Sequence, residues 1–173
     1  ILICQLECPL EAVTRAIELA RAQGVRVILN PAPARSLDTD LLHLVDYLIP
    51  NESETTLLTG IQVTDLSSAE KAAANLRERG VSTVILTLGE QGALLSTAEG
   101  IIHEGGYSVE VVDTTAAGDA FVGGFAVALA EGQLLQEAVR FANAAGALAV
   151  TRLGAQPSLP TRRAVEQFLA QHS

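Results

Sequence analysis

The sequence predicts an α/β fold in which a mainly parallel sheet carries helices on both faces. Short apolar strand-like runs alternate with helical patterns along most of the 173 residues, an order typical of parallel sheets. Polar or turn residues follow most of these strand-like runs, and such ends line the ligand crevice of an open parallel sheet. Apolar residues make up 49% of the chain. We therefore expect residues 1–173 to form a single globular α/β domain.

The first half of the chain alternates strand and helix patterns. Apolar residues recur at helical spacing after Pro9, and Gly24 marks the helix end. Asn51 can cap a helix, and Gly60 can end it. The predicted elements are a strand at 1–6, a helix at 9–23, a strand at 25–29, a short helix at 37–44, a strand at 47–49 and a helix at 52–58.

The second half continues this alternation and ends in helices. Ser67 to Glu70 forms a capping-box pattern that predicts a helix at 69–79. A β-branched run, Val109 to Val112, reads as a strand that leads into a turn at 113–119. The other predicted elements are strands at 81–88, 93–96 and 101–104 and helices at 117–131, 134–151 and 161–171.

Composition and charge exclude several classes of protein. The net charge of −9 argues against nucleic acid as a partner, because that binding needs a basic face. No apolar run is long enough to span a membrane, and no secretion signal is evident. Cys4 and Cys8 lack metal-ligand spacing, so we expect reduced thiols in a cytoplasmic protein.

Two residue types are informative because they are rare or missing. Lys71 is the only lysine and lies within a predicted helix, so a P-loop is excluded. Any phosphate site must then use backbone amides, arginine or a metal ion. The chain has no Met and opens inside an apparent strand, so we expect it to belong to a longer protein.

The turn from Asp113 to Asp119 is the most informative stretch. Its small residues leave backbone amides uncovered at the start of a helix, which favours phosphate binding. Asp119 lies in the same turn, where a carboxylate can act as the base in phosphoryl transfer. Alternatively, Asp119 only offsets the helix dipole, worth roughly 0.3–1 kcal/mol. Because Thr114 or Thr115 can cap this helix, we favour the functional interpretation.

Four other stretches carry polar groups at predicted strand ends or in loops. Asn51 and Glu54 fit a helix cap and a Mg²⁺ site equally well. Residues 87–92 read most simply as a strand end and a turn, and their two glycines are only weak evidence for a flat ligand against the backbone. Glu7 follows a strand, so it is either exposed or bound to something polar. Residues 154–158 form a carbonyl-rich loop that could hold a monovalent cation, although spacing alone favours a plain loop.

The residues from 113 to 119, with Phe121 and Gly123-Gly124 after them, resemble the second signature of the PfkB family of carbohydrate kinases. The family more often has Gly at the position of Ala116, and Ala there is familiar in its ribokinase group. The resemblance covers essentially the whole chain, and further matching stretches lie at 5–7, 30–35, 50–54, 87–89 and 149–158. It implies a ribokinase-like (Rossmann-like) fold, incomplete at its N-terminus.

The resemblance also implies a reaction and its residues. ATP would phosphorylate O5 of D-ribose, with Asp119 as the base and Glu7 at the sugar. Glu54 would act on Mg²⁺ through water. The anion hole would be formed by Ala116, Ala117, Gly118 and Asp119. The ATP contacts would be Asn51, Thr87, Leu88, Gly89, Glu90, Gln91, Gly92, Gly118, Asp119 and Asn143. The K⁺ neighbours would be Asp113, Thr115, Ala149, Arg152, Gly154 and Ser158.

The family pattern includes an N-terminal half that is not found in this sequence. The resemblance places most sugar contacts there, together with a small β-sheet lid that makes a homodimer. Two other functions stay open at this point. One is a different sugar or nucleoside kinase of the family, for example a fructokinase-like enzyme. The other is a non-catalytic ATP-binding module.

Overall fold

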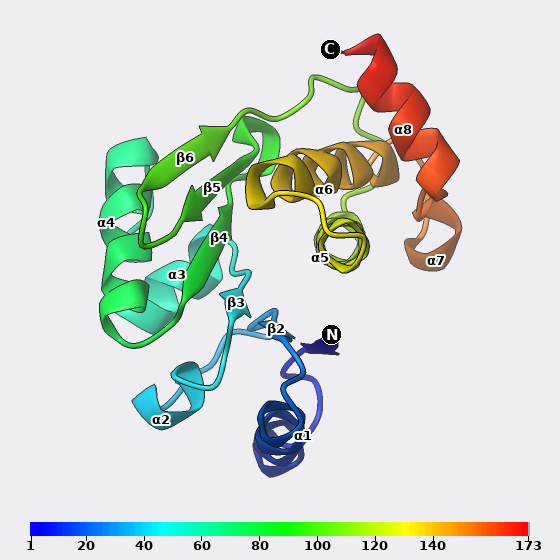
Figure 1. Ribbon diagram of the computed structural model, residues 1–173. Coiled ribbons are helices and arrows are strands. Elements are labelled where there is room, and N and C mark those ends of the chain that lie inside the picture. Colours follow the sequence, from blue (N-terminus) through cyan, green and yellow to red (C-terminus); the bar gives the residue numbers. More distant parts are fainter. Residues whose placement is uncertain (173) are drawn as a thin grey trace. The chain divides into compact units, whose positions relative to one another are not determined.

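The computed structural model describes residues 1–172, which fall into two compact units (Figure 1). The first, called the sheet unit, comprises Ile1–Leu88 and Leu94–His103. The second, called the helical unit, comprises Gly89–Ala93 and the described chain from Glu104 onward.

The six strands form one sheet in chain order, from β1 to β6 (Figure 1). The strands are β1 (Leu2–Cys4), β2 (Val27–Leu29), β3 (Tyr47–Leu48), β4 (Thr83–Thr87), β5 (Ala93–Ser96) and β6 (Ile101–Glu104). Strands β1 to β4 pair in parallel. A short turn, in which the Thr97 amide donates to the Gly100 carbonyl at 2.9 Å, connects β5 to β6, so these two run antiparallel. The prediction of a mainly parallel sheet is confirmed, although several strands are shorter than predicted.

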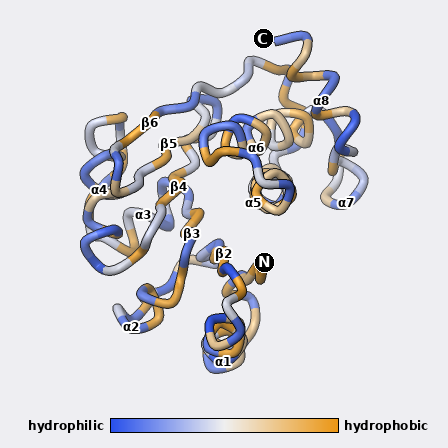
Figure 2. The backbone as a smooth tube through the Cα atoms, in the orientation of Figure 1, coloured by the Kyte–Doolittle hydropathy of each residue, from blue (hydrophilic) through white to orange (hydrophobic). Residues whose placement is uncertain are grey.

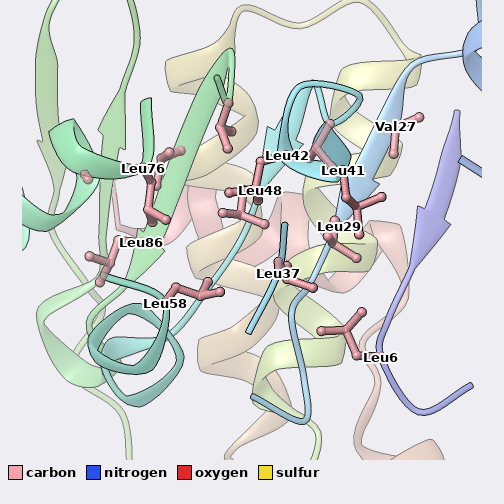
Figure 3. Close-up of a cluster of buried hydrophobic side chains, with 14 of the residues drawn as sticks. Leu6, Val27, Leu29, Leu37, Leu41, Leu42, Leu48, Leu58, Leu76 and Leu86 are labelled. Carbon is pink, nitrogen blue, oxygen red and sulfur yellow. The ribbon is translucent and has the colours of Figure 1, made fainter. Parts of the chain in front are cut away.

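Aliphatic side chains from strands and helices form the core of the sheet unit. Its helices are α1 (Leu10–Ala22), α2 (Thr39–Leu42), α3 (Glu52–Thr59) and α4 (Leu66–Glu78). Figure 3 shows leucines from these elements gathered together, among them Leu29, Leu48 and Leu76, all fully buried. Helix α1 carries both hydrophilic and hydrophobic positions (Figure 2), and it buries Val13 and Ile17. One face of α1 therefore joins the core.

Side chains cap two helices of the sheet unit. Asn51 caps α3 as predicted, and Gly60 ends that helix with a left-handed φ of 73°. The helix predicted at 69–79 is present as α4, but its predicted start is wrong. Asp65 is the N-cap and accepts from the Ser68 amide at 2.7 Å, while the Ser68 hydroxyl accepts from the Asp65 amide at 3.0 Å. Because this earlier cap satisfies both amides, the helix begins at Leu66 rather than at residue 69.

The helical unit is built on two closely packed helices. Its helices are α5 (Ala117–Ala130), α6 (Leu135–Ala149), α7 (Ala155–Ser158) and α8 (Arg162–Gln171). A Cβ built on Gly124 of α5 would lie 3.0 Å from the Ala145 Cβ and 3.3 Å from the Ala142 Cα of α6. The missing side chain at Gly124 therefore lets the two helices approach each other.

We expect Gly124→Val to lower the free energy of unfolding by about 1–3 kcal/mol, because the new side chain overpacks the α5–α6 contact. Gly123→Ala is the matched control, since a Cβ there meets no heavy atom within 4 Å. That change should be neutral or stabilising because alanine favours a helix. Urea unfolding of both variants measures the difference, and equal stabilities would contradict the packing account.

The predicted strand at Val109 to Val112 is absent, because residues 105–116 form no helix or strand. Val111 and Val112 are 59% and 56% exposed. The amides of Val112 and Asp113 instead donate to the Val150 carbonyl at the end of α6, at 2.8 and 3.1 Å. The turn before α5 therefore follows a loop held by α6, and not a strand.

Candidate active site

Polar side chains connect the carboxyl ends of β1, β2 and β3. The Gln5 amide group donates to Asn30 Oδ1 at 3.0 Å, and Asn30 Nδ2 donates to the Ile49 carbonyl at 2.8 Å. Glu7 follows β1 and is exposed. These ends form the row of polar groups that the sequence predicts, at the edge where parallel sheets bind ligands.

Asn51 and Thr87 lie side by side at the ends of β3 and β4. They form an isolated parallel bridge, and the Thr87 amide donates to the Pro50 carbonyl at 2.9 Å. Asn51 is exposed, so its neighbourhood is open to a ligand. The structure thus brings together two of the residues expected to contact ATP.

Glu54 lies beneath Asn51 and is 6% exposed. Its carboxylate accepts from the Asn51 amide at 2.9 Å and from Asn51 Nδ2 at 3.1 Å, while Asn51 Oδ1 accepts from the Glu54 amide at 2.8 Å. A capping box therefore holds the two side chains in one arrangement. Because Asn51 donors occupy both carboxylate oxygens, this geometry suits an indirect contact with Mg²⁺ through water.

Burial raises the pKa of the Glu54 carboxyl above 4.5, and the hydrogen bond from the Asn51 amide partly opposes this shift. A raised pKa in the folded state means that the folded protein holds the proton more tightly than the unfolded chain does. The stability linked to Glu54 is therefore fully present below about pH 4.5. It is lost as the pH rises through the folded-state pKa.

We accordingly expect Glu54→Gln to reduce the fall in unfolding free energy between pH 4.5 and neutrality. Glu52→Gln, in the same first turn of α3, is the control and should leave that fall unchanged. Urea unfolding over a series of pH values measures the effect. A Glu54→Gln profile parallel to that of the original protein would contradict the assigned pKa shift.

The N-terminus of α5 lacks a side-chain cap. Its N-cap is Ala116, which is 2% exposed. The prediction that Thr114 or Thr115 caps this helix is therefore wrong. The Thr115 hydroxyl instead donates to the Asp113 carboxylate at 2.5 Å. The first amides of a helix have no partner within it, and no side chain caps those of α5.

The amides of this turn differ in availability. The Ala117 amide donates to the Thr114 carbonyl at 3.2 Å. Gly118 is exposed, and a Cβ built there would meet no heavy atom within 4 Å. The space over Gly118 is therefore open to a phosphoryl group, which the amides and the helix dipole would favour. Asp119 lies next to Gly118 in the first turn and is also exposed.

Asp119 also borders a cavity of about 230 Å³ within the helical unit. Helix α5 contributes Gly123 and Val127 to its lining, and α6 contributes Phe141. Leu159 and Val165 line it from the segment that leads into α8 and from α8 itself. The cavity is thus mostly apolar, with the carboxylate of Asp119 among its few polar groups.

Asp113 ties the turn before α5 to the loop after α6. Its carboxylate accepts from the Thr115 amide at 2.9 Å, from the Thr115 hydroxyl and from the Gly154 amide at 2.8 Å. The Thr115 hydroxyl is the main cause that lowers the pKa of Asp113, followed by the amides of Gly154 and Thr115. The carboxylate is therefore ionised at neutral pH. The stabilisation that its hydrogen bonds provide is lost only when the pH falls below 3.8 and through the lowered pKa of Asp113 in the folded state.

The predicted K⁺ neighbours are thus partly brought together. Asp113, Thr115 and Gly154 are in contact. The Ala149 carbonyl accepts from the Arg152 amide at 3.2 Å, while Ser158 is buried and its hydroxyl donates to the Ala155 carbonyl at 2.7 Å. Carboxylate, hydroxyl and carbonyl oxygens are the donors that a hard cation prefers, so this set fits K⁺ in its chemistry.

Asn143 and the loop at 89–92 meet the same segment of chain. Asn143 is 8% exposed, and its Nδ2 donates to the carbonyls of Glu104 and Gly105 at 3.2 and 3.3 Å. Gly92 has a φ of 90°, and a Cβ there would lie 2.2 Å from the Glu104 carbonyl oxygen. Only glycine fits this approach. The predicted nucleotide residues Gly89 to Gly92 and Asn143 therefore share one neighbourhood.

Sequence reasoning missed an aromatic cluster in the helical unit. The ring centroids of Tyr107 and Phe168 are 5.0 Å apart in an edge-to-face arrangement, and His172 stacks on Phe168 at 4.1 Å. The available signal was the i, i+4 spacing of Phe168 and His172, which places them on one helix face. This cluster connects the C-terminal helix to the loop that follows β6.

Two absences hold for residues 1–172. No group of three or more His, Cys, Asp or Glu side chains there could hold a metal ion. No helix in the described part of the chain is long and apolar enough to cross a membrane.

The fold and the site define a class of protein. Parallel strands end in polar side chains, and a separate helix begins with uncapped amides beside an exposed carboxylate. This combination is typical of α/β proteins that bind phosphate-bearing ligands. Residues 2–162 match the model of the pfkB family carbohydrate kinases, and the chain belongs to this family.

The chain is similar to ribokinases in sequence and structure. It is 47% identical to the ribokinase of Haemophilus influenzae, over 97% of this chain and 55% of that protein. The structure of Arabidopsis thaliana ribokinase complexed with ribose and ATP superposes with a TM-score of 0.92 at 35% identity, over 96% of this chain and 55% of that one. Thermotoga maritima ribokinase gives a TM-score of 0.86 at 44% identity, over 97% of this chain and 56% of that one. These matches confirm the predicted ribokinase-like fold. The chain spans about half the length of these relatives.

Two further structures of related kinases contain ions. A putative ribokinase II from Escherichia coli is in complex with ATP and Mg²⁺. It has a TM-score of 0.78 and 33% identity, over 93% of this chain and 54% of that one. Phosphofructokinase-2 from the same organism is in complex with potassium. It has a TM-score of 0.79 and 29% identity, over 98% of this chain and 55% of that one.

Proposed function

We propose that this chain carries the ATP site and the catalytic base of a ribokinase, which transfers the γ-phosphoryl group of ATP to O5 of D-ribose. The observation that carries the proposal is the start of α5, where open space over Gly118 adjoins the exposed carboxylate of Asp119. The similarity to ribokinases over nearly the whole chain supports the choice of substrate.

The chemistry follows from this arrangement. The amides of residues 116–119 would stabilise negative charge on the transferring phosphoryl group. Asp119 would accept the proton of the sugar O5 hydroxyl while that oxygen attacks the γ-phosphorus, and the bond from phosphorus to the β–γ bridging oxygen of ATP breaks. ADP and ribose 5-phosphate are then the products. Mg²⁺, bound with ATP, would neutralise phosphate charge.

Other residues would position the ligands. Asn51 and Thr87 at the strand ends, the loop at 89–92 and Asn143 would contact ATP, and Glu54 would hold Asn51 in place. Asp113, Thr115 and the loop from Ala149 to Ser158 would hold K⁺, which adds positive charge beside the anion hole. Glu7 would contact ribose. We further propose that the whole protein is a homodimer, formed through a lid that lies outside this chain.

Equilibrium binding of a non-hydrolysable ATP analogue to this chain, with and without ribose, tests the proposal. We expect saturable binding of the analogue and a change in its affinity when ribose is added, because the proposed reaction requires the two ligands to bind next to each other. Glu7→Gln should weaken the effect of ribose, whereas Glu11→Gln, an exposed acid in α1, should not.

Binding of the analogue with no response to ribose would favour the second candidate, a non-catalytic ATP-binding module. That candidate is kept because the chain covers only 55% of its ribokinase relatives. No saturable binding of the analogue would contradict both functions. A response to another sugar or a nucleoside, but not to ribose, would favour a different kinase of the family.

A further inference from the structure

Asn30 opens one of the stretches that resemble the pfkB family, yet the proposed function gives it no role. It directly follows β2, and both ends of its side-chain amide are bonded. Its Oδ1 accepts from Gln5 Nε2 at 3.0 Å, and its Nδ2 donates to the Ile49 carbonyl at 2.8 Å. One side chain therefore connects the chain after β1 to the chain after β3, across the end of the strand between them.

Backbone hydrogen bonds support the same connection. The Asn30 amide donates to the Cys4 carbonyl at 2.9 Å. The amide of Leu6, a fully buried residue, donates to the Ala32 carbonyl at 2.7 Å. Together with the side-chain contact, these bonds fix the chain after β1 at three points directly before Glu7, which is exposed.

The two sides of this connection differ in how firmly they are held without Asn30. After β3, the Pro50 carbonyl accepts from the Thr87 amide at 2.9 Å, and a capping box fixes Asn51. Strand β1, in contrast, has only three residues and lies at the edge of the sheet in this chain. The chain after β1 therefore depends more on Asn30 than the chain after β3 does.

We propose that Asn30 is a positioning residue that holds the strand end bearing Glu7 in place relative to the strand ends that bind ATP. It acts through Gln5, its side-chain partner on that strand end. The inference rests on the proposed function, in which Glu7 contacts ribose and Asn51 contacts ATP. Loss of the Asn30 side chain lets Glu7 move and weakens ribose binding, while the ATP contacts stay in place.

Amide hydrogen exchange of this chain tests the positioning without any ligand. In Asn30→Ala and in Gln5→Ala, the Leu6 amide should exchange about fivefold faster than in the original protein, the usual effect of one lost hydrogen bond. The Leu76 amide in α4 should keep its rate. Gln23→Ala, which removes an exposed amide group after α1, should change neither rate. Unchanged exchange of Leu6 in Asn30→Ala, or equal acceleration of Leu6 and Leu76, would overturn the proposal.

Steady-state kinetics of the full-length enzyme test the consequence for ribose. Asn30→Ala should raise the KM for ribose about fivefold and leave the KM for ATP unchanged, a split that a general loss of stability does not produce. Gln5→Ala should behave in the same way, and Gln23→Ala should change neither constant. A rise in both KM values, or in neither while Glu7→Gln raises the KM for ribose, would contradict the proposed role.

A double-mutant cycle distinguishes failure of this inference from failure of the proposed function. Glu7→Gln alone should raise the KM for ribose, and adding Asn30→Ala should cause little further change, because both substitutions act on the same contact. Two independent effects would show that Asn30 does not act through Glu7 and would overturn the inference. If Glu7→Gln leaves the KM for ribose unchanged, the proposed sugar contact fails, whereas the exchange of the Leu6 amide still decides whether Asn30 holds the strand end.

Discussion

Replacing Asp119 with alanine in the full-length enzyme is expected to lower kcat by about 10²–10⁴ while ATP affinity stays near its original value. Asp119 is exposed in the first turn of α5, where, under the proposed function, it would reach a substrate hydroxyl beside the proposed anion hole. Without the carboxylate, no positioned group takes the proton during transfer. Steady-state rates with saturating ATP and ribose measure the loss, and equilibrium binding of an ATP analogue provides the control.

Asp119→Asn separates this role from the alternative interpretation. Asparagine keeps the shape of the side chain but cannot accept the proton as a carboxylate does, so it should lose as much rate as alanine. If Asp119 only offsets the helix dipole, both variants would lower stability by roughly 0.3–1 kcal/mol and leave kcat within a few-fold of the original. That result would remove the assignment of Asp119 as the base.

The second large effect is expected at Asp113. Potassium should activate the full-length enzyme more strongly than sodium, and Asp113→Ala should abolish this preference. The reason is that the Asp113 carboxylate accepts from Thr115 and from Gly154 at 2.8–2.9 Å. It thereby holds together the two loops that would surround the ion. Rates measured over a series of KCl and NaCl concentrations give the activation constants.

Substitutions at two neighbouring threonines test the same site with a smaller change to the side chain. Thr115→Val removes the hydroxyl that donates to Asp113 and should weaken K⁺ activation by about tenfold, the usual order for a hydrogen bond to a charged group. Thr114→Val changes an exposed neighbour and should leave activation unchanged. Equal rates in the two salts for the original enzyme would remove the ion site altogether.

Much of the fold could be predicted from the sequence, because the residues that start and end its helices interact with residues close to them in the chain. Asn51 and Gly60 bound α3 as expected, since a cap and a left-handed glycine each need only a few residues. The start of α4 was misplaced because two overlapping patterns compete, and Asp65 provides the earlier cap. The strand predicted at 109–112 is missing because strand propensity depends on a pairing partner. The Val112 amide bonds to the end of α6 instead.

The candidate site was predictable in composition but not in detail. Small residues before α5 and the carboxylate of Asp119 are visible in the sequence, and the helix begins where they predict. The hydrogen bond of Thr115 could not be predicted from the sequence. The local sequence is equally compatible with a Thr115 hydroxyl that caps the helix and one that bonds to Asp113. The contact of Asp113 with Gly154 spans distant residues. No local sequence pattern predicts a contact between residues so far apart in the chain. Only the family resemblance placed Asp113 and Gly154 at one site.

The most direct test of the account is a titration of this chain with a non-hydrolysable ATP analogue and Mg²⁺, followed through its backbone amide NMR shifts. We predict that the amides of Gly118 and Asp119 shift together with those of Gly89 to Gly92 and Asn51, with one common dissociation constant. Saturable shifts at the strand ends while Gly118 and Asp119 stay fixed would contradict the anion hole at the start of α5, and with it the assignment of Asp119 as the base.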